Sequence, residues 1–244
     1  YFELLRGTMP SSSNLFEGID TSWHRVKGGK EIQIMVDQLI ETYDFTSPVK
    51  SVAQLLKIYT KVQKLEDAHW RKIKSKELES LIIACAGIYL EAAITTDKAA
   101  YGATASLKIE AINRSTAQIT LDHIKITPTD SIIKQGILLQ DNTNFRTEIP
   151  ITITSDFRDT SAYWLREEGT LGMYEVADQK MIGRPETPQE NTVEFKLIIG
   201  GTPLIVARPL IYKYNDRVKG EVYEPFNIVP PVSSKLSSKV IIFA

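Results

Sequence analysis

The segment Leu107-Lys108-Ile109-Glu110-Ala111 alternates apolar and polar residues, and Gln118-Ile119-Thr120-Leu121 and Ile124-Lys125-Ile126 repeat the pattern shortly after it. A period of two places successive side chains on opposite faces of an extended chain, so each segment predicts a β-strand with one buried face. Asn113-Arg114-Ser115 separates the first two segments and is typical of a turn. The sequence therefore predicts antiparallel strands in this part of the chain.

Further strand candidates follow, at residues 136–140, 147–154, 192–199, 204–212 and 223–229. Gly200-Gly201-Thr202 joins two of them with residues that favour a tight hairpin. Seven or so short strands separated by turns are typical of an immunoglobulin-like antiparallel β-sandwich. We expect this sandwich to span residues 96–236.

The chain before these strands has a helical pattern. Between Lys30 and Ala100 it contains one proline and one glycine, and its apolar residues recur at spacings of three and four. The pattern predicts a first helix over residues 30–45. A second helix is expected after Ser47-Pro48, because serine is a good N-cap and proline is favoured at the first helical position.

A third helix is expected from Ser75, since Glu77 and Glu79 then occupy its first turn, where the helix dipole favours acidic side chains. Its apolar stripe continues to Ala92. Three amphipathic helices with short connections predict a small antiparallel bundle over residues 30–95. The fold class expected is therefore α+β and multidomain, with this bundle followed by the sandwich.

The two ends of the chain are interpreted as parts of neighbouring domains. Tyr1-Phe2-Glu3-Leu4-Leu5-Arg6 reads like the end of a helix, so residues 1–29 are expected to be a linker or the tail of a preceding domain. Val240-Ile241-Ile242-Phe243-Ala244 has a strand pattern, so residues 237–244 are expected to begin a further, truncated β-module. Together with Ile205-Val206-Ala207 it would leave an apolar strand edge exposed, which predicts dimerisation through that edge.

Composition and charge exclude several classes of protein. Hydrophobic residues make up 43% and charged residues 24%, as in an ordinary globular protein, which excludes a disordered or collagen-like chain. The 29 Lys and Arg against 30 Asp and Glu, net charge −1, lack the basic excess of a nucleic-acid binder. No apolar run reaches the ~18–20 residues that a membrane span needs. We therefore expect neither a nucleic-acid partner nor a membrane span.

Motifs for catalysis or metal binding are not found in the sequence. His24, His69 and His123 lie in separate segments outside any metal-ligand pattern, and Cys85 lies on an apolar helical stripe, where a buried structural thiol is expected. Glu167-Glu168 and the pair Asp216 and Glu221 would suit glycosidic hydrolysis only if two acids faced each other across a cleft. We expect a charged surface turn around Asp216 instead, and we predict no catalytic residue, metal ligand or cofactor in this chain.

The long connection over residues 155–190 is the candidate binding segment, because long ordered loops concentrate binding residues. Neighbouring aromatic residues there could stack on a sugar ring, although packing in the core or at a domain interface is the alternative. As candidate ligand-binding residues we take three aromatic side chains as stacking platforms and three arginines as hydrogen-bond donors: Tyr163, Trp164, Tyr174, Arg158, Arg166 and Arg184. This predicts a carbohydrate-binding module as one function.

Four phrases of the sequence point to a family. Residues 1–10 (YFELLRGTMP) and 16–26 (FEGIDTSWHRV) resemble the segment that follows the catalytic domain in large bacterial LmbE-like deacetylases, the PIG-L or GlcNAc-PI de-N-acetylase type. Residues 211–225 (IYKYNDRVKGEVYEP) and 229–232 (VPPV) are similar to a strand–turn–strand near the end of the same extension. The resemblance spans most of the chain, and its motifs are structural rather than catalytic.

The resemblance implies that the catalytic domain lies upstream. In this family that domain is an α/β fold that uses zinc and an H-x-D-D motif to hydrolyse N-acetyl groups from amino sugars or related conjugates. This chain has no such motif, so no catalytic residue is carried over and zinc is expected only in the upstream domain. The chain would then be a non-catalytic accessory region, a scaffold or spacer whose partner is its own catalytic domain. Proteins of this type are often exported, to the periplasm or beyond the cell.

Overall fold

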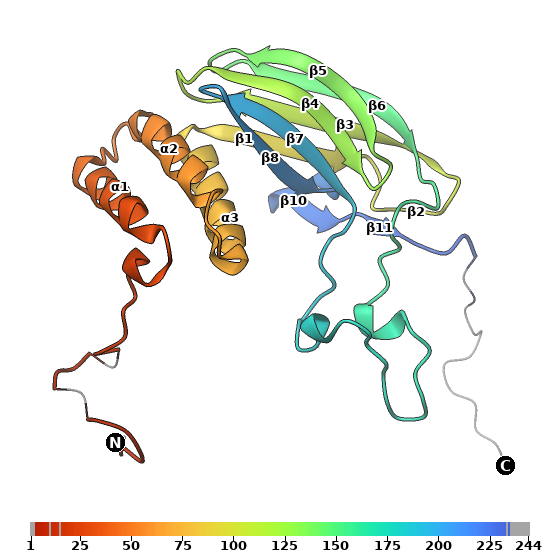
Figure 1. Ribbon diagram of the computed structural model, residues 1–244. Helices are drawn as coiled ribbons and strands as arrows, with labels where there is room; N and C mark the ends of the chain where they lie inside the picture. The colour runs from red at the N-terminus through yellow and green to blue at the C-terminus, as the bar shows by residue number, and fades with distance from the viewer. Residues whose placement is uncertain (1–2, 10, 15, 233, 235–244) are drawn as a thin grey trace. The chain divides into compact units, whose positions relative to one another are not determined.

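The computed structural model describes residues 3–9, 11–14, 16–232 and 234 (Figure 1). It is an α+β structure with three α-helices and mostly antiparallel sheets in the described chain. The chain divides into two compact units, Tyr1–Cys85 and Ala86–Ala244. The β-module expected over residues 237–244 lies outside the described residues.

The first unit is helical. After the 3₁₀ turn η1 (Trp23–Arg25), it contains α1 (Gly29–Thr42), the 3₁₀ turn η2 (Pro48–Ser51), α2 (Val52–Val62) and α3 (Ala68–Cys85). Pro48, which was expected to open the second helix, is the first residue of the 3₁₀ turn η2. The regular helix α2 begins only at Val52. Apolar side chains from the helices form the core of this unit: Ile32, Leu55, Ile58, Val62 and Ile82.

The bounds of α3 correct the sequence prediction at both ends. The helix begins at Ala68 rather than Ser75, because the Asp67 carboxylate accepts hydrogen bonds from the backbone N–H of His69 (2.9 Å) and Trp70 (3.1 Å) and so acts as its N-cap. It ends at Cys85 rather than near Ala92, since Gly87 adopts a left-handed conformation (φ 63°) that L-residues rarely adopt. The helical unit therefore stops at Cys85, short of the expected boundary at residue 95.

The second unit consists of β-strands, drawn from yellow to blue in Figure 1. A five-stranded sheet has the order β10-β9-β1-β3-β6, a four-stranded sheet the order β5-β4-β7-β8, and β11 pairs with β2. The pairs β1–β9 and β2–β11 are parallel and the other pairs are antiparallel. The strands are β1 (Ile88–Ile94), β2 (Lys98–Ala99), β3 (Thr104–Asn113), β4 (Ile119–Thr127), β5 (Ser131–Leu139), β6 (Asn144–Thr152), β7 (Thr192–Ile199), β8 (Thr202–Pro209), β9 (Ile211–Asp216), β10 (Gly220–Pro225) and β11 (Asn227–Ile228).

The core of the second unit follows the alternation seen in the sequence. Strand β3 buries Leu107 and Ile109, β4 buries Ile119 and Leu121, and β7 buries Val193, Phe195, Leu197 and Ile199. The residues between them are more exposed, as expected for strands with one buried face. Strand β1 differs, because six of its seven residues are buried and it shows no alternation. This is why its sequence resembles the continuation of a helix.

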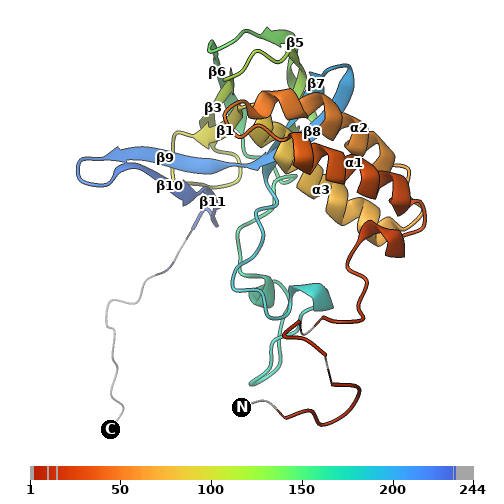
Figure 2. The same cartoon turned by 90° about the vertical axis from the view of Figure 1, so that its left-hand side faces the viewer.

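Two further predictions concern the edge of a sheet and the turn near Asp216. Strand β8 is the last strand of the four-stranded sheet, and Ile205 within it is 54% exposed. Association through this edge stays a prediction. Asp216 accepts hydrogen bonds from the backbone N–H of Val218 and Lys219, both at 2.8 Å, which confirms a charged turn between β9 and β10. Figure 2 shows these two strands as a projecting hairpin.

Candidate functional site

The segment between β6 and β7 is the long connection singled out in the sequence, and the 3₁₀ turns η3 (Tyr163–Leu165) and η4 (Gln179–Met181) are its regular elements. Asn191 joins its two ends. The Asn191 side chain is buried, its Nδ2 donates to the Arg158 carbonyl (2.7 Å), and its Oδ1 accepts from the Arg158 N–H (2.9 Å). One amide therefore pairs with the backbone at the start of the loop and holds it against the start of β7.

Other contacts attach the loop to the β unit. Phe157 is 2% exposed, and its carbonyl accepts a hydrogen bond from Tyr101 Oη (3.2 Å). Thr160 Oγ1 donates to the carbonyl of Ile228 in β11 (3.1 Å). Burial of an aromatic ring and hydrogen bonding of the loop backbone both favour a single conformation.

The two arms of the loop are also linked farther out. Thr187 Oγ1 accepts a hydrogen bond from the Tyr163 N–H (2.8 Å) and donates to the Ser161 carbonyl (3.3 Å). Tyr163 Oη donates to the Arg184 carbonyl (3.2 Å). The loop is therefore a built structure whose arms are joined by side-chain to backbone hydrogen bonds.

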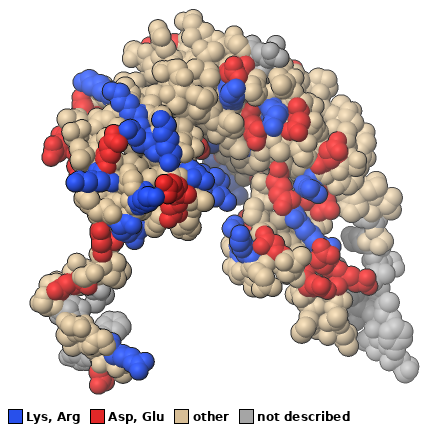
Figure 3. All heavy atoms as spheres, viewed as in Figure 1, with Lys and Arg blue, Asp and Glu red and all other residues tan. Residues whose placement is uncertain are grey.

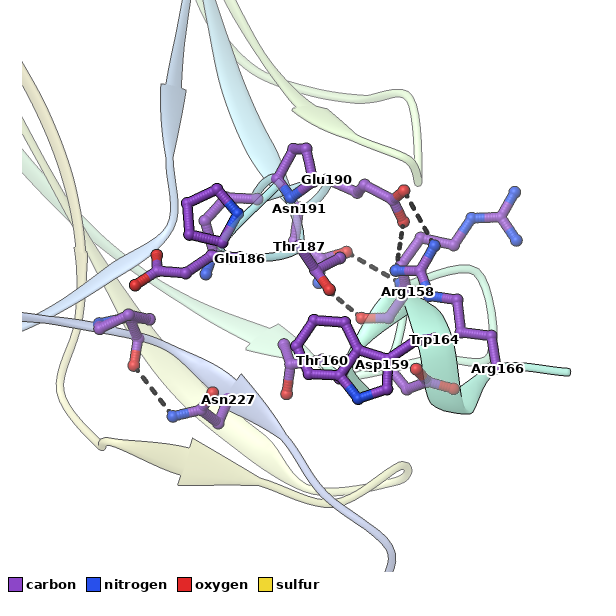
Figure 4. A pocket seen from close by; sticks show the side chains of 15 residues that line it. Arg158, Asp159, Thr160, Trp164, Arg166, Glu186, Thr187, Glu190, Asn191 and Asn227 are labelled. Carbon is purple, nitrogen blue, oxygen red and sulfur yellow. Dashed lines mark hydrogen bonds and ion pairs between the residues drawn. The ribbon is translucent and has the colours of Figure 1, made fainter. Parts of the chain in front are cut away.

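A cavity of about 270 Å³ lies between the arms, and its side chains are drawn in Figure 4. Arginine, tryptophan, carboxylate and amide groups line it, and β11 contributes Asn227 from a distant part of the sequence. A second hollow of about 310 Å³ adjoins Arg158 and Arg166. We call the cavity between the arms the loop cavity. Its polar and charged side chains, together with Trp164, are Arg158, Asp159, Thr160, Arg166, Glu186, Thr187, Gln189, Glu190, Asn191 and Asn227.

The arrangement of the charged wall is fixed by a two-pronged ion pair. Arg166 Nη1 and Nη2 each donate to one oxygen of Glu190, at 3.2 Å, as the dashed lines in Figure 4 show. The two side chains are 31% and 36% exposed. A bidentate pair orients both groups and leaves further N–H donors and lone pairs free for a ligand.

Three of the six predicted ligand-binding residues line this cavity, namely Arg158, Trp164 and Arg166. Trp164 is half-buried, and the Tyr163 ring packs edge-on against it with ring centroids 4.8 Å apart. Tyr163 does not line the cavity, and its ring adjoins it through the indole of Trp164. The two aromatic residues are thus neither fully exposed, as a stacking pair requires, nor buried in the core.

The other two predicted residues lie outside the cavity. Tyr174 is 69% exposed on the outer part of the loop. Arg184 Nε donates to the carbonyl of Lys180 (3.2 Å) and so supports the end of η4. Sequence reasoning missed Glu190, Thr187 and Asn227. Glu190 follows two prolines closely, but nothing in the sequence around Asn227 links it to a loop more than thirty residues earlier.

Within the described residues, no three side chains of His, Cys, Asp or Glu lie together as metal ligands would. Cys85 is half-buried at the end of α3, and burial raises the pKa of its thiol. Glu167 and Glu168 are exposed and do not line the cavity.

On the face drawn in Figure 3, basic and acidic side chains lie interspersed. No helix among the described residues combines the length and apolarity needed to cross a bilayer.

No family model and no curated protein matches the chain. Among solved structures, it is similar to the Pseudomonas fluorescens alkylpurine DNA glycosylase AlkC bound to DNA containing an abasic site analogue, with a TM-score of 0.26 and 11% identity. The match covers 73% of this chain and 50% of that protein, so it spans half of the glycosylase. A likeness this weak carries no argument about function.

Proposed function

We propose that the loop cavity binds carbohydrate and that the β unit acts as a carbohydrate-binding module. The observation that carries the proposal is the position of Trp164 at the cavity beside the Arg166–Glu190 pair. An indole presents a flat apolar surface to the C–H face of a sugar ring, while fixed guanidinium and carboxylate groups hydrogen-bond its hydroxyls. The cavity volume, about 270 Å³, favours one ring held inside with the rest of the glycan outside.

The experiment is isothermal titration calorimetry with four neutral tetrasaccharides: cellotetraose, xylotetraose, mannotetraose and N-acetylated chitotetraose. We expect one of them to bind the wild-type protein, and Trp164→Ala to weaken that binding at least tenfold, about 1.4 kcal/mol. Tyr174→Ala is the matched control, because it removes an exposed aromatic ring from the same loop outside the cavity. Equal binding by both variants, or none by the wild type, would refute this function.

We also propose that the two sheets form an immunoglobulin-like sandwich. The strand order supports it, because β3 pairs with β6 in one sheet and β4 pairs with β7 in the other, so each sheet contains neighbours that are far apart in sequence. Such pairings are made by Greek-key connections, the hallmark of this architecture. One central strand of each sheet, β3 and β7, also buries alternate residues, as the inner faces of a sandwich do.

A further proposal concerns the longer protein to which this chain would belong. We infer that the chain is a non-catalytic accessory region, a scaffold or spacer, of an exported zinc-dependent LmbE-like N-deacetylase, with its own upstream catalytic domain as partner and as the site of the zinc. The similarity of residues 211–225 to a strand–turn–strand supports it, since β9 and β10 form such a hairpin. The test is the coding sequence upstream of Tyr1. An H-x-D-D motif within a strand–helix pattern is expected, and a bare signal peptide there would reject the proposal.

A further inference from the structure

A separate cavity of about 570 Å³ lies on the five-stranded sheet, away from the long loop and its two hollows. Two rows of residues line it, and the members of each row lie opposite one another on neighbouring strands. Glu91 of β1 lies opposite Glu110 of β3, which lies opposite Arg146 of β6. In the next row Ala93 lies opposite Lys108, which lies opposite Glu148. Because the intervening residues of β3 are buried in the core, these side chains share the outer face of the sheet.

The first row holds its acceptors in place. Glu91 is 7% exposed, its Oε2 accepts from Tyr89 Oη (2.5 Å), and its Oε1 lies 2.6 Å from Lys213 Nζ. Glu110 Oε1 accepts from Arg146 Nη2 (3.1 Å) and from the Asn144 amide. Both carboxylates are therefore oriented before any ligand arrives, which reduces the entropy lost on binding.

The second row provides the space and a lysine that makes no ion pair with the described residues. Ala93 lies between Lys108 of β3 and Ile211 of β9 in register, so a small side chain flanked by long ones leaves a hollow over the central strand. Glu148 Oε1 accepts from Ser106 Oγ (2.6 Å). Within the described part of the chain, no carboxylate oxygen lies within 4.0 Å of Lys108 Nζ.

The charges at the cavity determine the class of ligand. Three carboxylates, Glu91, Glu110 and Glu148, are balanced by three cations, Lys108, Arg146 and Lys213. A charged ligand gains little net attraction from such a lining. A neutral ligand rich in hydroxyl groups can instead hydrogen-bond with oriented charged donors and acceptors, which form stronger bonds than neutral ones.

We propose that this sheet face is a second ligand site, which binds a neutral oligosaccharide lying across β1, β3 and β6. It uses none of the residues of the loop cavity and does not rest on the function proposed for it. The probes are the same four neutral tetrasaccharides, titrated by calorimetry into a Trp164→Ala background, in which the loop cavity is disabled.

The test variant is Lys108→Ala/Glu148→Gln, which changes two exposed side chains and leaves the ion pair between buried Glu91 and Lys213 intact. We expect it to weaken binding at least tenfold in the Trp164→Ala background. Lys219→Ala/Glu224→Gln is the matched control, an exposed lysine and a glutamate with one hydroxyl donor on the β9–β10 hairpin outside the cavity, and it should bind as its parent does. Circular dichroism would verify that each variant is folded.

Two results would overturn the proposal. The first is that no tetrasaccharide binds the Trp164→Ala protein, or that Lys108→Ala/Glu148→Gln binds as tightly as its control. The second is that a charged probe, a zwitterionic tetrapeptide, binds the Trp164→Ala protein more tightly than any of the tetrasaccharides, with an affinity that falls steeply between about 50 mM and about 500 mM NaCl as screening of charges predicts. Failure of this site leaves the Trp164 comparison in the wild-type background unaffected, so the two proposals fail separately.

Discussion

The side-chain amide of Asn191 makes two hydrogen bonds with the backbone of Arg158, a residue that precedes it by thirty-three positions. It satisfies one N–H and one carbonyl at the point where the long loop leaves the β unit and returns to it. Because the amide is 2% exposed, water does not compete for these bonds. The candidate binding cavity therefore depends on a residue that does not have to contact the ligand.

Asn191→Ala is expected to destabilise the protein by about 1–3 kcal/mol, because it leaves backbone polar groups of Arg158 without partners. Urea unfolding monitored by circular dichroism measures this. Limited trypsin digestion should also cut after Arg166 or Lys180 faster than in the wild type. Asn14→Ala, which changes an exposed amide, is the control and should have no measurable effect. Equal stability and cleavage rates would show that the loop does not depend on Asn191.

Arg166 and Glu190 are expected to act together in sugar binding but to contribute little to stability. Arg166→Ala and Glu190→Gln should each lower oligosaccharide affinity, and the double variant should lose less than the sum of the two. About a third of each side chain is exposed, so a double-mutant cycle on unfolding should give a coupling of only about 0.5 kcal/mol. Additive losses of affinity would contradict a coupled pair.

The pair of buried Glu91 and partly buried Lys213 predicts a larger effect. Lys213→Met leaves a carboxylate that is 7% exposed without its cation and should destabilise the β unit by about 3 kcal/mol. Adding Glu91→Leu should recover most of that loss, because replacing both members of a buried pair by apolar residues is often neutral. Chemical unfolding of the single and double variants provides the comparison, and a double variant as unstable as Lys213→Met would argue against this account.

Asp44 provides a prediction on pH. Hydrogen bonds from the Thr46 hydroxyl, from Lys50 and from the Thr46 backbone N–H lower the pKa of its carboxyl to about 2. A folded-state pKa below the unfolded one means that the group stabilises the fold above the unfolded pKa, and that this contribution is lost as the pH falls towards 2. An NMR titration of the side-chain carboxyl should give the low pKa, and Thr46→Ala should raise it. Thr42→Ala, on α1, should not.

The exposed edge strand β8 predicts self-association. Ile205 is 54% exposed on this last strand of its sheet, and unpaired strand edges template pairing with a second chain. Elution volume in size-exclusion chromatography should shift with protein concentration, and Ile205→Lys should reduce the shift. Monomeric elution over a wide range of concentrations would contradict the prediction.

The strands with one buried face could be predicted from sequence because their side chains obey a local rule. In β3 and β7 every second residue is buried, and β4 alternates on either side of an irregularity between Leu121 and His123, so the order of apolar and polar residues along each strand already shows the pattern. Strand β1 could not be predicted in this way. Glu91 and Ala93 are buried on one face, Leu90 and Ala92 on the other, and the pairing of β1 with both β3 and β9 decides this.

The residues of the candidate cavity show the same distinction between what the sequence predicts and what the tertiary structure decides. Trp164, Arg158 and Arg166 could be chosen from sequence, because they are aromatic and arginine residues in a long connection. Their proximity to Glu190 and Asn227, and the separation of Tyr174 and Arg184 from them, depend on how Asn191, Thr187 and Ile228 hold the loop. The sequence by itself determined the periods of the elements, which are set by neighbouring residues. Only the tertiary structure decided which residues meet, because those contacts join positions far apart in the chain.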